Sequence, residues 1–109
     1  MPTKSEPTAE QMFEAVAAAL GTIPQVTRKT GRGFASGGLF WRGRLFATLR
    51  GDHLLLKLPA ARVEALIASA LAAPFDANKG KPMREWALVG PDGDWAALAE
   101  EALAFAQRA

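Results

Sequence analysis

The chain has 109 residues, of which 50% are hydrophobic and 22% charged, a composition that fits one globular domain with a single core. It has no cysteine and only one histidine, His53, which excludes disulfides, thiolate nucleophiles and Cys-ligated metal centres. The formal net charge is +2, which favours no class of partner by itself. We expect a single domain over residues 1–109, with residues 1–7 as a disordered lead-in.

Targeting and membrane segments are not expected. The first residues are polar and carry Lys4, Glu6 and Glu10, unlike a signal peptide. The longest uncharged stretch, residues 15–27, is interrupted by Gly21 and Pro24 and is shorter than the roughly 20 residues of a membrane-spanning helix. We therefore predict a cytoplasmic protein with no membrane contact.

The first predicted element is a helix over residues 8–20. Thr8 and Gln11 have the spacing of a capping box, and Gly21 supplies a stop after the last apolar residue. Apolar residues recur along this stretch at helical spacing, namely Phe13, Val16, Ala17 and Leu20. The glycines between 31 and 38 then predict a turn or irregular segment.

Three strands are predicted next, over residues 39–42, 44–50 and 53–58. Gly51-Asp52 matches a two-residue hairpin turn between the second and the third. In the second strand we expect Leu45, Ala47 and Leu49 on one face and Phe46 and Thr48 on the other. In the third strand one face carries Leu54, Leu56 and Leu58, and the other carries His53, Leu55 and Lys57.

The remainder predicts a helix, a strand and a helix. Pro59 suits the first position of a helix that Pro74 ends, a short apolar strand covers residues 85–89, and Asp94 can cap the last helix. The predicted order of elements is helix, three strands, helix, strand, helix (α-β-β-β-α-β-α). This order indicates an α+β fold, a two-layer domain with an antiparallel sheet.

The charge is unevenly distributed along the chain. Residues 28–57 carry seven basic side chains against Asp52 alone, with Phe34, Phe40, Trp41 and Phe46 interleaved. Such a layer can grip phosphates and stack bases. The candidate nucleic-acid contacts are Arg28, Lys29, Arg32, Arg42, Arg44 and Arg50, and this interpretation requires Arg42, Arg44 and Arg50 to share one exposed face. The alternative is a solvated face whose arginines pair with helix carboxylates such as Glu64.

Signals of catalysis are weak, and we predict no enzyme activity, no catalytic residues, no metal and no cofactor. His53 follows a hairpin turn, where an exposed imidazole is common, and a lone histidine cannot form a two-histidine metal site within one chain. Glu85 beside Trp86 could be a carboxyl group with a raised pKa, but a strand-edge Glu that pairs with Arg62 or Arg84 is the favoured interpretation. An enzyme would need a pocket that gathers His53 or Glu85 with other polar groups.

Several segments resemble the N-terminal domain of the TfoX/Sxy family over residues 10–107. They are Gly38-Leu39, Arg42–Ala47, Leu56–Val63, Pro74–Asp76, Lys81–Trp86 and a last helix with Trp95, Leu98, Glu101, Ala102 and Phe105. The resemblance implies an α+β domain related to MmcQ/YjbR-like folds. It also implies positive regulation of transcription in natural competence, through contact with another regulator. The family's Met-Phe-Gly start is Gly33-Phe34-Ala35 here, and the C-terminal helical domain of full-length regulators has no counterpart in this sequence.

The function predicted from the sequence is therefore a small non-enzymatic regulatory or adaptor domain that acts through protein contacts, with a transcription regulator as partner. The candidate interaction surface consists of the polar positions that recur in the TfoX/Sxy family, namely Lys57, Arg62, Lys81 and Arg84. Open sheet edges favour a homodimer. Direct nucleic-acid binding by residues 28–57 is the alternative.

Overall fold

A computed structural model of the chain describes residues 8–28, 37–76 and 83–108. The predicted lead-in 1–7 and most of the glycine-rich segment lie outside the described residues. The elements are α1 (Ala9–Leu20), β1 (Val26–Arg28), β2 (Leu39–Trp41), β3 (Arg44–Arg50), β4 (His53–Lys57), α2 (Ala60–Ala68), β5 (Ala72–Pro74), β6 (Trp86–Val89) and α3 (Trp95–Arg108).

The helix termini follow the polar signals in the sequence. Thr8 Oγ1 accepts a hydrogen bond from the Gln11 N–H at 3.1 Å, and Gln11 Oε1 accepts one from the Thr8 N–H at 2.8 Å, which completes the predicted capping box. Asp94 Oδ1 accepts from the Ala97 N–H at 3.1 Å and so caps α3. Pro59 is the N-cap of α2 instead of its first helical residue.

All six strands form one antiparallel sheet in the order β1-β2-β3-β4-β6-β5. β3 pairs with β4 from Arg50↔His53 to Ala47↔Leu56, so Gly51 and Asp52 are the two turn residues, as predicted. Gly51 has a φ of 60°, the left-handed conformation that such a turn requires. The α+β architecture is confirmed, and β1 and β5 extend the predicted sheet at its two edges.

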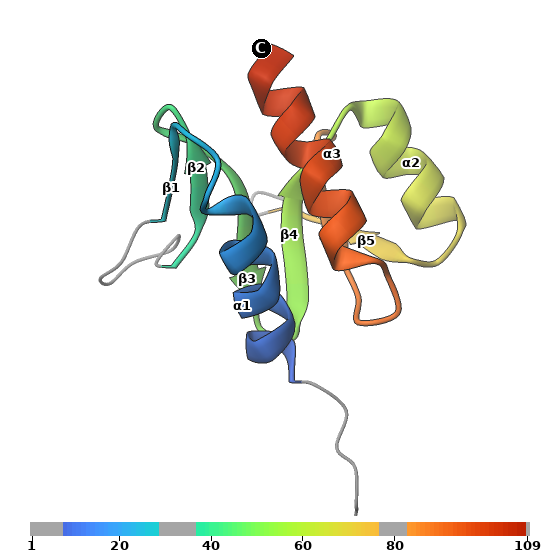
Figure 1. Cartoon of the computed structure of the whole chain (residues 1–109). Helices are drawn as coiled ribbons and strands as arrows, with labels where there is room; N and C mark the ends of the chain where they lie inside the picture. The colour runs from blue at the N-terminus through green and yellow to red at the C-terminus, as the bar shows by residue number, and fades with distance from the viewer. Residues whose placement is uncertain (1–7, 29–36, 77–82, 109) are drawn as a thin grey trace, which may run out of the picture.

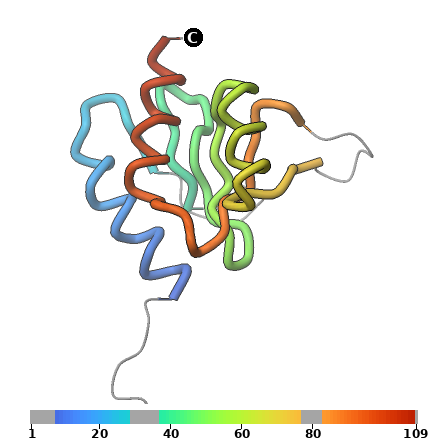
Figure 2. Tube along the Cα trace, turned by 90° about the vertical axis from the view of Figure 1, so that its right-hand side faces the viewer, coloured from blue at the N-terminus to red at the C-terminus, as the bar shows by residue number. Residues whose placement is uncertain are grey.

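The helices form a layer against one face of this sheet. α1 and α3 pack against each other, α3 crosses β3 and β4, and α2 packs against β5 and β6 (Figure 1). Figure 2 shows α1 and α3 on the same side of the central strands. One hydrophobic core joins the two layers. Its fully buried members include Leu39, Ala47, Leu54, Leu56, Leu58, Ala87, Val89 and Ala102.

The predicted alternation holds in β4 but not throughout β3. Leu54, Leu56 and Leu58 are in the core, whereas Phe46 also belongs to the core although it was predicted on the face opposite Ala47. The cause is a β-bulge. Leu39 pairs with Ala47 and Phe40 with Leu45, so that Phe46 is an extra residue between the two pairs.

The second helix ends earlier than predicted, at Ala68 instead of near Pro74. Ala70 adopts a φ of 63°, its N–H donates to the Ile67 carbonyl, and the Leu71 N–H donates to the Leu66 carbonyl. These two bonds define a Schellman motif, which stops the helix. The next residues pair with β6 as the edge strand β5.

In the described part of the chain no helix is long and apolar enough to cross a membrane.

Candidate functional site

The most unusual surface feature is a methionine that the main chain holds in an exposed position. Met83 is 38% exposed and is the only large hydrophobic side chain classed as exposed among the described residues. Its N–H donates to the Phe75 carbonyl at 2.7 Å, and its carbonyl accepts from the Trp86 N–H at 3.1 Å. These bonds fix the segment between the end of β5 and the start of β6. Met83 is therefore presented by a defined turn beside the half-buried Trp86.

Two adjacent hollows flank this turn and share Met83, Arg84 and Trp86. The first, of about 210 Å³, lies against α2 and has a mostly apolar lining. The second, of about 510 Å³, is more open and lies toward the end of β4. We call the two together the Met83 surface, whose residues are Lys57, Ala60, Val63, Glu64, Ile67, Pro74, Met83, Arg84, Glu85 and Trp86.

Charges of both signs surround this apolar centre. Lys57 Nζ lies 5.9 Å from the centroid of the Trp86 ring, within cation–π range. Arg84 lines both hollows, Glu64 lines the first and Glu85 the second. None of these four side chains forms an ion pair with another described residue.

The predicted interaction residues separate into different environments. Lys57 and Arg84 lie together on the Met83 surface. Arg62 instead makes two hydrogen bonds to Glu101 of α3, which raises the pKa of its guanidinium. Lys81 lies outside the described residues. Met83 was not among the predicted site residues, because a single apolar residue after Pro82 shows no periodic pattern.

Two of the predicted nucleic-acid contacts bind within the chain. The Arg28 guanidinium donates to both carboxylate oxygens of Glu14, at 2.8 and 2.6 Å, and to the Gly37 carbonyl at 3.1 Å. The hydrogen bond from Arg28 holds the pKa of Glu14 below its ordinary value of 4.5. Arg42 Nε donates to Gln25 Oε1 at 2.7 Å. Helix-carboxylate pairing thus occurs for Arg28, with Glu14 as the partner instead of Glu64.

Arg44 and Arg50 occupy opposite ends of the seven-residue strand β3 and line different pockets. That Arg42, Arg44 and Arg50 share one exposed face therefore stays a prediction. Lys29 and Arg32 lie outside the described residues.

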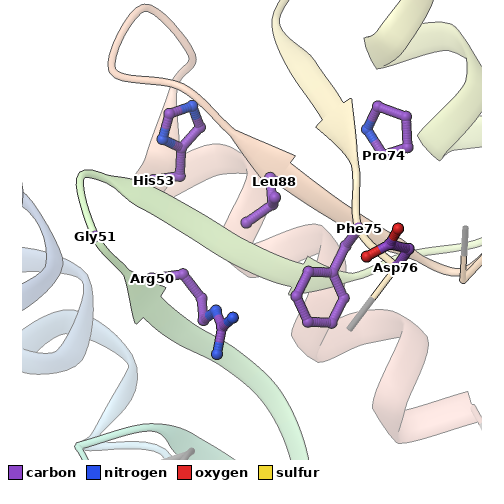
Figure 3. Close-up of a pocket in the computed structure, with 7 residues that line it drawn as sticks. All are labelled: Arg50, Gly51, His53, Pro74, Phe75, Asp76 and Leu88. Carbon is purple, nitrogen blue, oxygen red and sulfur yellow. The ribbon is translucent and has the colours of Figure 1, made fainter. Parts of the chain in front are cut away.

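The sheet face that carries no described helix holds an open pocket of about 430 Å³ near the β3–β4 turn (Figure 3). Arg50 and His53 enter it from paired positions of β3 and β4, and Phe75 and Asp76 enter it from the end of β5. The Arg50 guanidinium lies 5.3 Å from the centroid of the Phe75 ring. His53 Nδ1 is 2.7 Å from Asp52 Oδ1, which orients the imidazole.

This pocket has an oriented imidazole, but its described lining contains no Ser, Thr or Lys that could act as a nucleophile. Glu85, the other predicted acid–base candidate, lies elsewhere. His53 begins β4, whereas the Glu85 carbonyl accepts from the Leu58 N–H just beyond the end of that strand, about 17 Å of extended chain away. The described residues contain no group of three or more His, Cys, Asp or Glu side chains that could hold a metal ion.

Comparison with known proteins finds no protein family, no curated protein and no solved structure that matches this chain.

Proposed function

We propose that this protein is a small regulatory or adaptor domain that works by binding a segment of another protein on the Met83 surface. The supporting observation is the exposed, main-chain-fixed Met83 beside Trp86. Protein interfaces are enriched in Met, aromatic residues and Arg, with an apolar centre and a polar rim. The Met83 surface has these components in that arrangement, since charged side chains border its apolar hollows.

Hydrogen bonds hold the main chain at the centre of this surface, which favours binding. Two main-chain hydrogen bonds position Met83, and the Trp86 ring lies under the Lys57 ammonium. Less conformational entropy is lost on binding when the main chain of the contacting segment is already fixed. The partner segment would place apolar side chains in the hollow against α2 and charged side chains of both signs along the rim.

The mixed charge of the surface favours a protein partner over a nucleic acid. A phosphate backbone binds best to a one-signed basic groove, whereas Glu64 and Glu85 stand among the cations here. Two arginines of the basic segment 28–57, Arg28 and Arg42, also donate hydrogen bonds to side chains of the same chain. Transcriptional regulation, which the TfoX/Sxy resemblance implies, stays a prediction about the process in which the partner acts.

A random-peptide display library tests the proposal directly. Selection against the immobilised protein, with counter-selection against Met83→Gln, should enrich peptides that combine large apolar and charged residues. A synthetic copy of the consensus should bind the wild type at least about tenfold more tightly than Met83→Gln, measured by fluorescence polarisation. Ala104→Gln, an exposed position on α3 outside the surface, should bind like the wild type.

Three outcomes contradict the proposal. The first is failure to enrich a consensus, and the second is equal affinity for wild type and Met83→Gln. The third is a self-association, measured by light scattering, that Met83→Gln abolishes, since the second copy would then be the occupant. In parallel, labelled duplex DNA should not bind the protein in a salt-sensitive way. Salt-sensitive DNA binding that the double variant Arg42→Ala/Arg44→Ala weakens would favour the nucleic-acid alternative.

A further inference from the structure

A separate pocket of about 240 Å³ lies between the start of β3, the end of β4 and the C-terminal turns of α3. We propose that it binds a small organic acid, a monocarboxylate with an apolar body. This inference goes beyond the protein-binding function and does not depend on it. Only Lys57 and Glu85 line both this pocket and the Met83 surface.

The walls of the pocket are apolar. Ala102, Phe105 and Ala106 project from successive turns of α3, and Leu45 contributes from β3. The pocket is more enclosed than the hollows of the Met83 surface, because α3 extends over the end of the sheet (Figure 1). Small residues at 102 and 106, one helical turn apart, leave room that larger side chains would fill. Such walls accept a hydrocarbon chain or ring.

The rim of the pocket is charged and carries an excess of cations. Arg44 and Lys57 stand on it with Glu85, and no ion pair joins them to each other or to another described residue. Arg108 adds a third cation nearby, with its Cζ 5.6 Å from the centroid of the Phe105 ring. An arginine and a lysine beside an apolar cavity are suited to a carboxylate whose hydrocarbon part enters the cavity.

Size and charge narrow the ligand class further. The pocket is smaller than the roughly 300–1,000 Å³ of sites for drug-sized ligands, so the ligand must be smaller than these. Glu85 on the same rim repels a second negative charge, which disfavours phosphate esters and dicarboxylates. A single carboxylate on an apolar body fits both constraints.

Octanoate, octan-1-ol and octylammonium form a matched set of probes, because they share a chain and differ in the charge of the head group. Titrations followed by backbone amide NMR should show octanoate binding at least about tenfold more tightly than octanol, with no binding of octylammonium. Arg44→Gln should weaken octanoate about tenfold and leave octanol unchanged. Ala106→Phe should block both, and its thermal unfolding verifies that the variant is folded.

The controls separate this site from the Met83 surface. Arg84→Gln removes a cation that lines only the Met83 surface, so it should leave octanoate binding unchanged. The proposal is overturned if the three probes bind equally or if octanoate does not bind. It is also overturned if Ala106→Phe binds octanoate as tightly as the wild type does. The free amino acid leucine, which carries both a carboxylate and an ammonium group, serves as a fourth probe. If leucine binds more tightly than octanoate, the monoanion assignment is overturned, because the ammonium group would then pair with Glu85.

Discussion

Arg62 of α2 and Glu101 of α3 form a two-point ion pair, with Nε to Oε1 at 2.9 Å and one terminal nitrogen to Oε2 at 3.2 Å. The pair joins two helices through residues that are 39 positions apart in the sequence. Arg62 therefore has a structural partner, although the sequence pattern placed it with Lys57 and Arg84 as an interaction residue.

The Arg62–Glu101 pair should contribute only modestly to stability. Both side chains are partly exposed, so a double-mutant cycle of Arg62→Ala and Glu101→Ala should give a coupling free energy of about 0.2–1 kcal/mol. Urea unfolding of the four proteins measures it. Zero coupling would show that the pair does not stabilise the contact between the helices. A marked effect of Glu101→Ala on consensus-peptide binding would show that the pair also contributes to partner binding.

Ala70→Gly should stabilise the protein. Ala70 has a φ of 63° at the end of α2, a conformation that costs an L-residue roughly 1–2 kcal/mol and glycine almost nothing. Glycine also gives the unfolded chain more freedom, which offsets part of the gain. We expect the free energy of unfolding to rise by up to about 1 kcal/mol, whereas Ala65→Gly within the same helix should lower it by a similar amount. A loss of stability in Ala70→Gly would contradict the Schellman ending.

Thr48→Val should be neutral or stabilising. The Thr48 hydroxyl is buried in the middle of β3 and has no hydrogen-bond partner among the described residues. A buried unsatisfied polar group costs about 1–3 kcal/mol, and valine has nearly the same shape without the hydroxyl. The exposed Thr27→Val variant on β1 serves as the control and should change little. Strong destabilisation by Thr48→Val alone would mean that the hydroxyl is bonded in solution.

The Glu14–Arg28 pair should make stability depend on pH in the acidic range. Since the pKa of folded Glu14 lies below its ordinary value of 4.5, the folded state holds the proton less tightly than the unfolded state. The contribution of the pair is therefore complete above about pH 4.5 and disappears as the pH falls through the folded pKa. Thermal unfolding should show Glu14→Gln below wild type at about pH 6, with the difference shrinking toward about pH 3.

The Arg28→Gln background provides the matched control for this titration. There Glu14→Gln should produce no pH-dependent difference, because the partner that lowers the pKa of Glu14 is already gone. A difference that persists unchanged in this background would assign the pH dependence to another group.

Much of the fold could be predicted from local signals in the sequence. The Thr8–Gln11 capping box, the Gly51-Asp52 turn and the Asp94 cap each depend on residues within four positions of one another, and all three form. The missed features have other causes. The bulge at Phe46 and the edge strand β5 depend on pairing between distant segments, and the end of α2 uses an alanine where glycine or asparagine is the recognisable signal.

The candidate site was only partly predictable for the same reason. The family resemblance indicated Lys57 and Arg84, which share a hollow, but it could not show that Arg62 pairs with Glu101. Charge patterning could not show that Arg28 pairs with Glu14. Trp86 belongs to the predicted apolar strand 85–89 and is only half-buried. The exposure of Met83 results from main-chain bonds to Phe75 and Trp86, and no spacing rule in the sequence encodes these contacts.

The most direct test of the central claim is a map of where the selected consensus peptide binds. Backbone amide NMR of the labelled protein, titrated with that peptide, should show the largest shifts at Lys57, Ile67 and Met83–Trp86. Residues near the pocket at Arg50 and His53 should change little. Shifts concentrated at the β3–β4 turn, at β1, or along Arg42 and Arg44 would contradict the assignment of the Met83 surface as the protein-binding site.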